Sequence, residues 1–537
     1  MRSTHRRRRA ATQTNTPRTA LGRRRRGVAA AALTGLAVPA VLLGLPPADA
    51  APSDLDLTFG NRGQVTVDAA GAGVAASGSD LALLPDGSVV AVGSLDSPDR
   101  AAYVAEIGPT GVVDPSFGVR RLDLAGSSEA AYAVAVQADG KIVVAGRTTK
   151  NQDGAVWRLL PSGEPDRTFS GDGLATLDSA GSEELYDVAI APDGKIVAVG
   201  TTTAEGGQMA VYRLTTAGEP DQTFDTDGAR GVGGAGADYG LAVAVQPDGK
   251  VLVTGSEAAA PDLTVHRLTA TGQPDPAFDG DGAASVPGTD PYAYGLTLQP
   301  DGRILVGGQV LTAAQTYDIV VARLTPSGAV DATFGGPSGV RIDFGASEDV
   351  YALGVTPSGD VLGSGATDLD QDALLFQLRA DGSPDTDFGP GGVRVVPGAT
   401  RVVQGLVVQP DGRFLVIGDD GATAPHPVVF RFLGDPPSVG VGSSPTCHGR
   451  TATIVGTAGK DRLTGTSGAD VVVALGGNDV VKGLGGNDVV CAGDGNDKVS
   501  GGSGKDLLYG ESGKDRLVGG SGKDRLVGGP QRDEVRP

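Results

Sequence analysis

Short runs of alternating apolar and polar residues, separated by tight-turn signals, cover most of the chain. In one such stretch, EAAYAVAVQ (129–137) is followed by ADG and then by KIVVAGR (141–147). The Asp-Gly pair favours a turn because glycine adopts positive φ without steric cost, so the stretch predicts a β-hairpin. Equivalent stretches recur along the sequence, and they predict an all-β protein with short antiparallel strands.

An Asp-x-x-Phe motif recurs at intervals of 52 to 58 residues, measured between the phenylalanines. It occurs seven times, as DLTF (56–59), DPSF (114–117), DRTF (166–169), DQTF (221–224), DPAF (275–278), DATF (331–334) and DTDF (385–388). Each unit contains four predicted strands, which in the second unit are VRRLDL, AAYAVAVQ, KIVVAGR and AVWRLL. Seven such units over residues 51–433 predict a seven-bladed β-propeller. A sandwich array or an open solenoid is the alternative, but a closed ring leaves no sheet edge exposed.

The recurring pattern (V/P)D-x-x-F-G, Q-P-D-G-K-I-V-V-A-G and R-L resembles the delta-60 repeat family of bacterial secreted and surface proteins. The resemblance covers residues 54 to 434 and implies a propeller. It implies little about function, because the family is largely uncharacterised.

Two side-chain patterns recur inside these units. An arginine stands eight residues before the motif aspartate in four units (Arg158, Arg213, Arg267 and Arg323), which predicts a structural ion pair at the corner between blades. An acidic residue also precedes a tyrosine near the start of one strand in five units. These pairs are Glu129/Tyr132, Glu184/Tyr186, Asp238/Tyr239, Asp290/Tyr292 and Glu348/Tyr351. In a closed propeller they would recur around one rim and suit a sugar, a cation or a basic peptide; packing at solvated strand ends is the alternative.

The C-terminal region, residues 452–537, follows a strict nine-residue frame from Gly456 onward. The fourth position is glycine in eight frames, and the eighth is Leu or Val in all nine. The sixth position is aspartate throughout: Asp461, Asp470, Asp479, Asp488, Asp497, Asp506, Asp515, Asp524 and Asp533. A glycine-rich turn followed by a three-residue strand predicts a coil of two frames, with Leu or Val inside and the aspartates aligned along two edges.

Stacked carboxylates repel one another unless a hard cation lies between them. The frame resembles the RTX, or haemolysin-type, calcium-binding repeat, G-G-x-G-x-D-x-U-x, over residues 456–535. The resemblance implies a parallel β-roll in which several Ca²⁺ ions are shared between aspartates and turn carbonyls of alternate frames. A calcium-free solenoid is the alternative.

The fifth position of the frame is Asn478, Asn487 and Asn496 in the centre, whereas lysines occupy it in four other frames. Ammonium groups near an ion weaken cation binding. We therefore expect the strongest sites around the central five aspartates, from Asp470 to Asp506, and weaker sites toward the end.

The N-terminal segment indicates where the protein is expected to be located. Residues 1–50 combine two arginine runs with an apolar stretch (27–45) and Ala48-Asp49-Ala50, which predicts a cleaved signal peptide, on either the general or the twin-arginine export route. A membrane anchor is the alternative reading of the stretch. The protein is therefore expected outside the cell, secreted or associated with the cell surface. There Cys447 and Cys491 are expected to form a disulfide, with free thiols as the alternative. Residues 434–451, rich in Pro, Gly and Ser, are expected to be a linker.

The net charge of the chain and the absence of common enzyme motifs make several functional classes less compatible with the sequence. The full chain has a net charge of −20, and loss of the leader makes it −29, which disfavours nucleic acid and anionic membranes as partners. The sequence contains no phosphate-binding loop, dinucleotide fingerprint or G-x-S-x-G motif. The expectation is a secreted, non-catalytic calcium-binding protein whose propeller is an interaction platform for an unknown extracellular glycan or protein. A secreted propeller enzyme acting on polysaccharide is the second class, and an RTX toxin the third.

Overall fold

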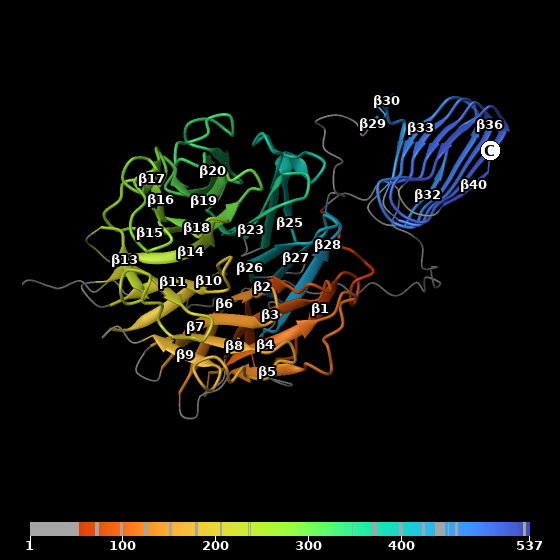
Figure 1. The fold of residues 1–537 in the computed structure, drawn as a ribbon. Helices are drawn as coiled ribbons and strands as arrows, with labels where there is room; N and C mark the ends of the chain where they lie inside the picture. The colour runs from red at the N-terminus through yellow and green to blue at the C-terminus, as the bar shows by residue number, and fades with distance from the viewer. Residues whose placement is uncertain are drawn as a thin grey trace, which may run out of the picture. The chain divides into compact units, whose positions relative to one another are not determined.

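The propeller predicted from the repeats is present in the structure, which is a computed structural model (Figure 1). Residues 53–536 are described, except the segments 70–74, 97–99, 123–126, 150–152, 178–180, 204–206, 235, 237, 291, 346, 368–372, 397–400, 421–424, 435–445, 449, 457–459, 494 and 530–532. The expected signal peptide and most of the expected linker lie outside these residues. Within them, seven four-stranded antiparallel sheets form the seven blades.

The strand bounds follow the chain order of the blades. Blade 1 contains β2 (Ala75–Leu83), β3 (Val89–Asp96), β4 (Ala102–Ile107) and β5 (Val119–Leu122); blade 2 contains β6 (Glu129–Val136), β7 (Ile142–Thr148), β8 (Gly154–Leu159) and β9 (Leu174–Leu177); blade 3 contains β10 (Glu183–Ile190), β11 (Ile196–Thr202), β12 (Gln208–Leu214) and β13 (Ala229–Val232). Blade 4 contains β14 (Tyr239–Val245), β15 (Val251–Ser256), β16 (Leu263–Leu268) and β17 (Ala283–Val286); blade 5 contains β18 (Ala293–Leu298), β19 (Ile304–Leu311), β20 (Tyr317–Leu324) and β21 (Val340–Ile342). Blade 6 contains β22 (Glu348–Val355), β23 (Val361–Thr367), β24 (Ala373–Leu378), the short 3₁₀ element η2 (Pro390–Gly392) and β25 (Val393–Val395); blade 7 contains β26 (Arg401–Val408), β27 (Phe414–Asp419), β28 (Pro427–Phe432) and β1 (Gln64–Thr66).

The sequence repeat and the blade are offset by one strand. The four strands expected to form the second unit begin with VRRLDL, but the structure places that strand, β5, in blade 1. The same offset leaves the first strand of the chain, β1, to complete blade 7 by pairing with β28, Gln64 opposite Phe430. The N-terminal strand therefore closes the ring, which removes the open edge that blade 7 would otherwise present.

Arginine, aspartate and phenylalanine join neighbouring blades. In blade 3, Arg213 Nε donates a hydrogen bond to Asp221 Oδ2 at 2.7 Å, and its guanidinium carbon lies 4.6 Å from the centre of the Phe224 ring. Arg213 Nη1 also donates to the carbonyl of Ala270, in a turn of blade 4. Arg158, Arg267, Arg323 and Arg431 make the equivalent contacts. The predicted ion pair at the corner between blades is thus confirmed.

The pair at the ring closure joins two ends of the propeller sequence. Arg431 Nε donates to Asp56 Oδ2 at 3.0 Å, although 375 residues separate them. Its Nη1 donates to the carbonyl of Pro109 in blade 1. The two remaining blades lack this arginine: Gln377 donates to Asp385 Oδ2 at 3.1 Å in blade 6, and Glu106 occupies the position in blade 1.

The C-terminal region is a parallel β-solenoid of about four turns, as its nine-residue frame predicted. One five-stranded sheet contains β31 (Ile454–Val455), β33 (Val471–Val473), β35 (Val489–Cys491), β37 (Leu507–Tyr509) and β39 (Arg525–Val527); the other contains β32 (Arg462–Thr464), β34 (Val480–Gly485), β36 (Lys498–Gly504), β38 (Arg516–Gly522) and β40 (Glu534–Arg536). Each residue pairs with the one 18 positions later, for example Val472 with Val490. The eighth-position Leu and Val side chains of both sheets meet in one core.

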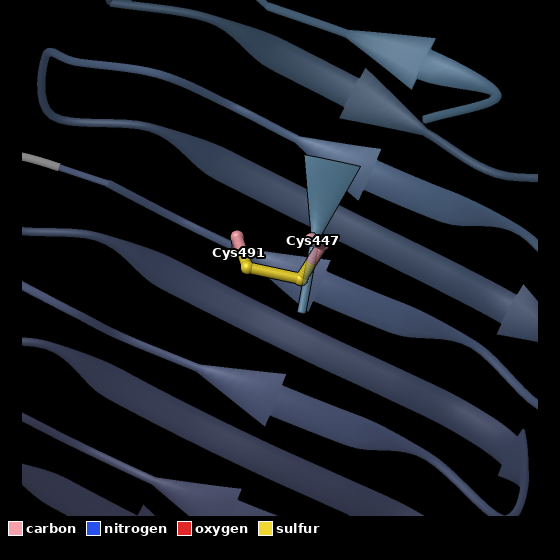
Figure 2. The surroundings of a disulfide bond; sticks show 2 residues. All are labelled: Cys447 and Cys491. Carbon is pink, nitrogen blue, oxygen red and sulfur yellow. A yellow bond between two sulfur atoms is a disulfide. The ribbon is translucent and has the colours of Figure 1, made fainter. Parts of the chain in front are cut away.

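A short hairpin covers the outer face of the β33–β35–β37 sheet. It consists of β29 (Thr446–Cys447) and β30 (Arg450–Thr451). A disulfide joins Cys447 in this hairpin to Cys491 in β35, as the sequence predicted (Figure 2). Beside it, the ring of His448 stacks on Tyr509 with the ring centres 3.7 Å apart. The bridge closes a loop of 44 residues and so restricts the unfolded chain, which stabilises the start of the solenoid.

The corner arginines are expected to be a main source of propeller stability. Burial alone would raise the pKa of Asp221, but hydrogen bonds from Thr223 and the nearby cations Lys195 and Arg213 hold it at about 2. Substitution of Arg213 with Gln leaves this buried carboxylate without its main partner, so we expect the free energy of unfolding to fall by about 3 kcal/mol. Urea denaturation, followed by the fluorescence of Trp157, measures the change.

The matched control for this substitution is Arg100→Gln. Arg100 pairs with Asp96 at 3.8 Å, and both side chains are more than half exposed. Its loss is expected to change stability by less than about 0.5 kcal/mol. Equal destabilisation by the two substitutions would contradict a special role of the corner.

Candidate functional site

The sixth-position aspartates form two ladders along the edges of the solenoid. In seven of the nine carboxylates, one oxygen accepts a hydrogen bond from the backbone N–H of the aspartate 18 residues earlier; Asp488 Oδ1, for example, accepts from Asp470 N at 2.9 Å. Seven such bonds, 2.7 to 3.0 Å long, link the described aspartates. One ladder contains Asp470, Asp488, Asp506 and Asp524; the other contains Asp461, Asp479, Asp497, Asp515 and Asp533. This is the alternation that the two-frame coil predicted.

The second oxygen of these carboxylates faces a small space rich in other oxygens. In Asp479, Asp488, Asp506 and Asp515, Oδ2 is buried and no residue described in the structure hydrogen-bonds to it. Asp488 Oδ2 lies against the α-carbon of Gly483, so close that a Cβ there would collide both with it and with the carbonyl oxygen of Gly501. A carboxylate oxygen of one turn and a carbonyl oxygen of the next thus border the same space.

This donor set fits a hard cation such as Ca²⁺. Calcium takes six to eight oxygen ligands from carboxylates, carbonyls and water. The unpartnered Oδ2 atoms are oxygens of the required type, and a buried oxygen without a partner is otherwise costly. At Asp488, Asp506 and Asp515, the glycine at the first position of the frame keeps the space free of side-chain atoms, whereas the frame of Asp479 has Ala474 there.

Burial and mutual repulsion disfavour the ionised form of these carboxylates. Burial raises the pKa of Asp488 above its ordinary value, and the charges of Asp506 and Asp470 raise it further. Burial likewise raises the pKa of Asp479, Asp506 and Asp515, each with a neighbouring aspartate of its own ladder as a further cause. A bound cation would relieve this repulsion.

The ladders are less enclosed at their ends. Asp470, Asp479, Asp488, Asp497, Asp506 and Asp515 are buried, whereas Asp461 and Asp524 are partly exposed. The expectation of stronger central sites is a statement about affinity, and it stays a prediction.

The fifth-position residues lie outside the carboxylate ladder. The side-chain oxygen of Asn487 accepts a hydrogen bond from the backbone N–H of Lys505 at 2.8 Å, and Asn496 accepts from Lys514 in the same way. These asparagines therefore brace successive turns through the backbone. The side chains of Lys505 and Lys514 are exposed, and no ion pair links either of them to an aspartate among the described residues.

In the propeller, the acidic residues and tyrosines predicted at one rim occupy different environments. Glu129, Asp238 and Glu348 are buried at the start of their strands. Asp290 is partly exposed, and Tyr239 and Tyr292 are 39% and 38% exposed. Tyr132, Tyr186 and Tyr351 line the mouth of the central channel, together with Tyr294, which the sequence analysis did not select.

A β-bulge explains this arrangement. The inner strand of every blade contains a register shift that redirects a side chain; the shift skips one residue in blades 1 to 6 and the three residues 402–404 in blade 7. The residues at these shifts are Ser79, Tyr132, Tyr186, Leu241, Tyr294, Tyr351 and Gln404, and all of them line one cavity of about 160 Å³. Each stands six positions before the first residue of the following turn, as Tyr294 does before Pro300. That spacing is the signal that would have found them.

Two further acidic residues lie in the channel wall. Asp187 Oδ2 accepts a hydrogen bond from the backbone N–H of Val243 in the next blade at 2.7 Å, and Asp80 accepts from Val134 at 2.9 Å. Burial raises the pKa of each to about 7. At the mouth, the Tyr186 hydroxyl donates to Glu184 Oε2 at 2.7 Å, and Arg147 pairs with Glu184. Asp80 and Asp187 thus join blades and also give the channel an acidic wall.

Matches to known protein families agree with the fold of the propeller and with that of the C-terminal solenoid. The description "Domain of unknown function (DUF5122) beta-propeller" matches residues 137–169, 191–224, 246–278 and 299–334. The description "RTX calcium-binding nonapeptide repeat (4 copies)" matches residues 455–490, 464–499, 492–526 and 500–535. No curated protein matches the sequence. In the described residues, no helix has the length and apolar character needed to cross a membrane.

Similar folds occur among solved structures. The Kuenenia stuttgartiensis hydrazine synthase shows 13% identity over 66% of this chain and 96% of its own, with a TM-score of 0.43. A protein of unknown function from Dyadobacter fermentans shows 14% identity over 69% and 98%, with a TM-score of 0.39. The β-propeller domain of the Trilobed protease from Pyrococcus furiosus shows 12% identity over 67% and 96%, also with a TM-score of 0.39. Likenesses of this level carry no functional argument.

The strand order, the aspartate ladders and the matched repeats agree with one another. The chain carries DUF5122 β-propeller repeats followed, at its C-terminal end, by RTX calcium-binding nonapeptide repeats.

Proposed function

We propose that the protein is secreted and non-catalytic, with a calcium-stabilised tail and a propeller that serves as an interaction platform. The single observation that carries the calcium part is the row of buried second oxygens, of which Asp488 Oδ2 is the clearest. The second oxygens of Asp488, Asp506 and Asp515 each face a carbonyl oxygen of the adjacent turn across a glycine. Such oxygens are stable inside a protein when a cation completes their coordination.

The tail residues would couple calcium binding to folding. When bound, Ca²⁺ supplies positive charge between stacked carboxylates. The backbone N–H of each aspartate already fixes one carboxylate oxygen, so the second oxygen is held in place before binding. The core of Leu and Val forms only when the turns stack, and binding to the stacked form alone adds to its stability. The high calcium concentration outside cells would favour the folded tail there.

The propeller would supply the binding surface for a glycan or protein ligand. Its channel mouth combines four tyrosines with the acidic side chains of Asp80, Asp187 and Glu184. Tyr132 and Tyr186 lie with ring centres 5.6 Å apart, and Tyr294 and Tyr351 lie 6.2 Å apart. Aromatic side chains beside hydrogen-bonding groups dominate many binding sites, which favours this mouth as the contact region.

The calcium ladder can be tested with Asp488→Asn. In calcium, we expect weaker binding by at least about tenfold and a less stable tail, because one charged ligand is lost. In chelator, we expect the same substitution to stabilise the tail, because it removes a buried charge that has no partner. Calorimetric titration and hydrogen exchange of residues 460–529 measure the two effects.

Asp524→Asn is the matched control, because Asp524 belongs to the same ladder but is partly exposed at its end. We expect it to have the smaller effect in both conditions. The absence of any calcium response in the wild-type tail would refute the calcium assignment itself.

The raised pKa values predict opposite pH dependence with and without calcium. The folded, metal-free tail holds protons on Asp479, Asp488, Asp506 and Asp515 above the pH at which the unfolded chain releases them. Its stability should therefore fall as pH rises from about 4 toward neutrality. In calcium the trend should reverse, since protons compete with the ion for the same oxygens. Hydrogen exchange of the tail at several pH values distinguishes these trends.

The platform role can be tested with Tyr186→Ala at the channel mouth and Tyr292→Ala as an exposed tyrosine outside it. On a glycan array and in pull-down from intact cell surfaces, Tyr186→Ala should reduce retention at least about tenfold, whereas Tyr292→Ala should not. Equal retention by both variants would exclude the mouth as the site. Release of new sugar ends from a polysaccharide would instead support the enzyme alternative.

A further inference from the structure

The two outer faces of the solenoid differ in chemistry. On the face of the β33–β35–β37 sheet, the outward residues Val473, Val489 and Cys491 pack under the disulfide-linked hairpin. On the opposite face, which we name the basic face, the outward side chains of β32, β34, β36, β38 and β40 are mostly polar. They are Arg462, Thr464, Val480, Lys482, Lys498, Ser500, Arg516, Val518, Glu534 and Arg536. Five of these ten are basic and one is acidic.

The basic residues of this face are open to solvent, and three of them have no acidic partner. Arg462, Lys482 and Lys498 are exposed, and among the described residues no carboxylate forms an ion pair with any of them. The single acidic residue, Glu534, pairs with Arg516 at 3.5 Å and with Arg536 at the end of the sheet. The three consecutive strands β32, β34 and β36 therefore present positive charge without an acidic partner.

Basic side chains placed next to one another repel and so destabilise the sheet. A need for solubility alone does not explain this placement. Lys498 and Arg516 are direct partners in the ladder of β36 and β38. Neighbouring strands are about 4.8 Å apart, and like charges directly opposite each other destabilise a sheet. The rest of the sequence is strongly acidic, with 64 acidic against 44 basic residues in the full chain. An anionic partner would compensate for this local repulsion.

Calcium would strengthen the positive field of the face. Residues 456–535 contain twelve acidic and ten basic side chains, so the metal-free tail has a net charge of −2. Each bound ion adds two positive charges, and two ions already reverse the sign. At physiological salt, interactions fade beyond about 8 Å, so the local charge of the tail matters more than the charge of the whole chain.

We propose that the basic face of the calcium-loaded solenoid binds a linear acidic polysaccharide. This inference rests on the calcium binding proposed above. A linear polyanion can follow the row of charges from Arg462 to Arg516 along the solenoid axis. The face is only two outward columns wide and carries no aromatic side chain, which disfavours a membrane, where apolar insertion supports binding, and single-stranded nucleic acid, where stacking does.

The test uses the full-length secreted protein and dextran sulfate as the probe, with neutral dextran as the reference polymer. The triple variant R462A/K482A/K498A removes three charges from the basic face. In calcium, we expect it to bind dextran sulfate roughly a hundredfold more weakly than the wild type, with a smaller dependence on salt. The wild type in chelator should also bind weakly.

The matched control is K505A/K523A/R525A, which removes three exposed charges of the solenoid that lie off the basic face. It should retain binding within a few fold, and both triple variants should keep the wild-type calcium response in calorimetry. Equal weakening by the two variants, or equal binding of anionic vesicles through the same residues, would overturn the proposal. A wild-type tail that binds calcium but not dextran sulfate would overturn it while leaving the calcium function intact; a tail without a calcium response would refute the calcium function instead.

Discussion

The 18-residue register of the solenoid is the constraint on which the rest of the tail depends. Because every strand pairs with the one two frames later, each residue type stacks on its own kind. For Leu and Val this stacking builds a core, and for aspartate it builds a row of like charges inside the protein. The backbone N–H groups satisfy only one oxygen of each carboxylate. The same repeat that stacks the core therefore also stacks carboxylates whose repulsion a bound cation would relieve.

The propeller also repeats a buried aspartate, but there the chain itself supplies the positive charge beside it. Its units stack around a ring, and in five of the seven blades the motif aspartate is compensated by an arginine that also contacts the next blade. The ring closes through the same chemistry, because Arg431 and Asp56 come from its two ends and form the same pair as Arg213 and Asp221. A buried ion pair of this kind disfavours alternative packing, since displacement of either partner leaves a buried charge. The propeller thus carries its counter-charges within the chain, whereas the solenoid takes them from solution.

The sequence predicted the tail more completely than the propeller, and the reason is geometric. In the solenoid, the strands pair at a separation of two nine-residue frames. The frame alone therefore places Asp470 next to Asp488 in the ladder and Leu or Val in the core. In the propeller, a register shift in each inner strand redirects a side chain, and the pattern of an acidic residue before a tyrosine does not mark the position of that shift. Tyr292 was expected at the rim because Asp290 precedes it, whereas Tyr294 is the tyrosine of this blade that lines the channel. The Arg431–Asp56 pair was missed because its two residues come from opposite ends of the propeller sequence, 375 positions apart, where the eight-residue spacing does not apply.

The departures from the nine-residue frame carry more information than its matches. A uniform repeat would give a solenoid with two equivalent faces, but the seventh and ninth positions vary. Cysteine at 491 ties the hairpin to one sheet, whose outward residues are apolar, while Lys482 and Lys498 keep the other sheet polar. Since only the seventh and ninth positions point outward, these substitutions alter the surface without disturbing the core or the aspartate ladders. The repeat thereby separates two sets of positions: the invariant ones form the core and the aspartate ladders, and the variable ones give each face its own chemistry.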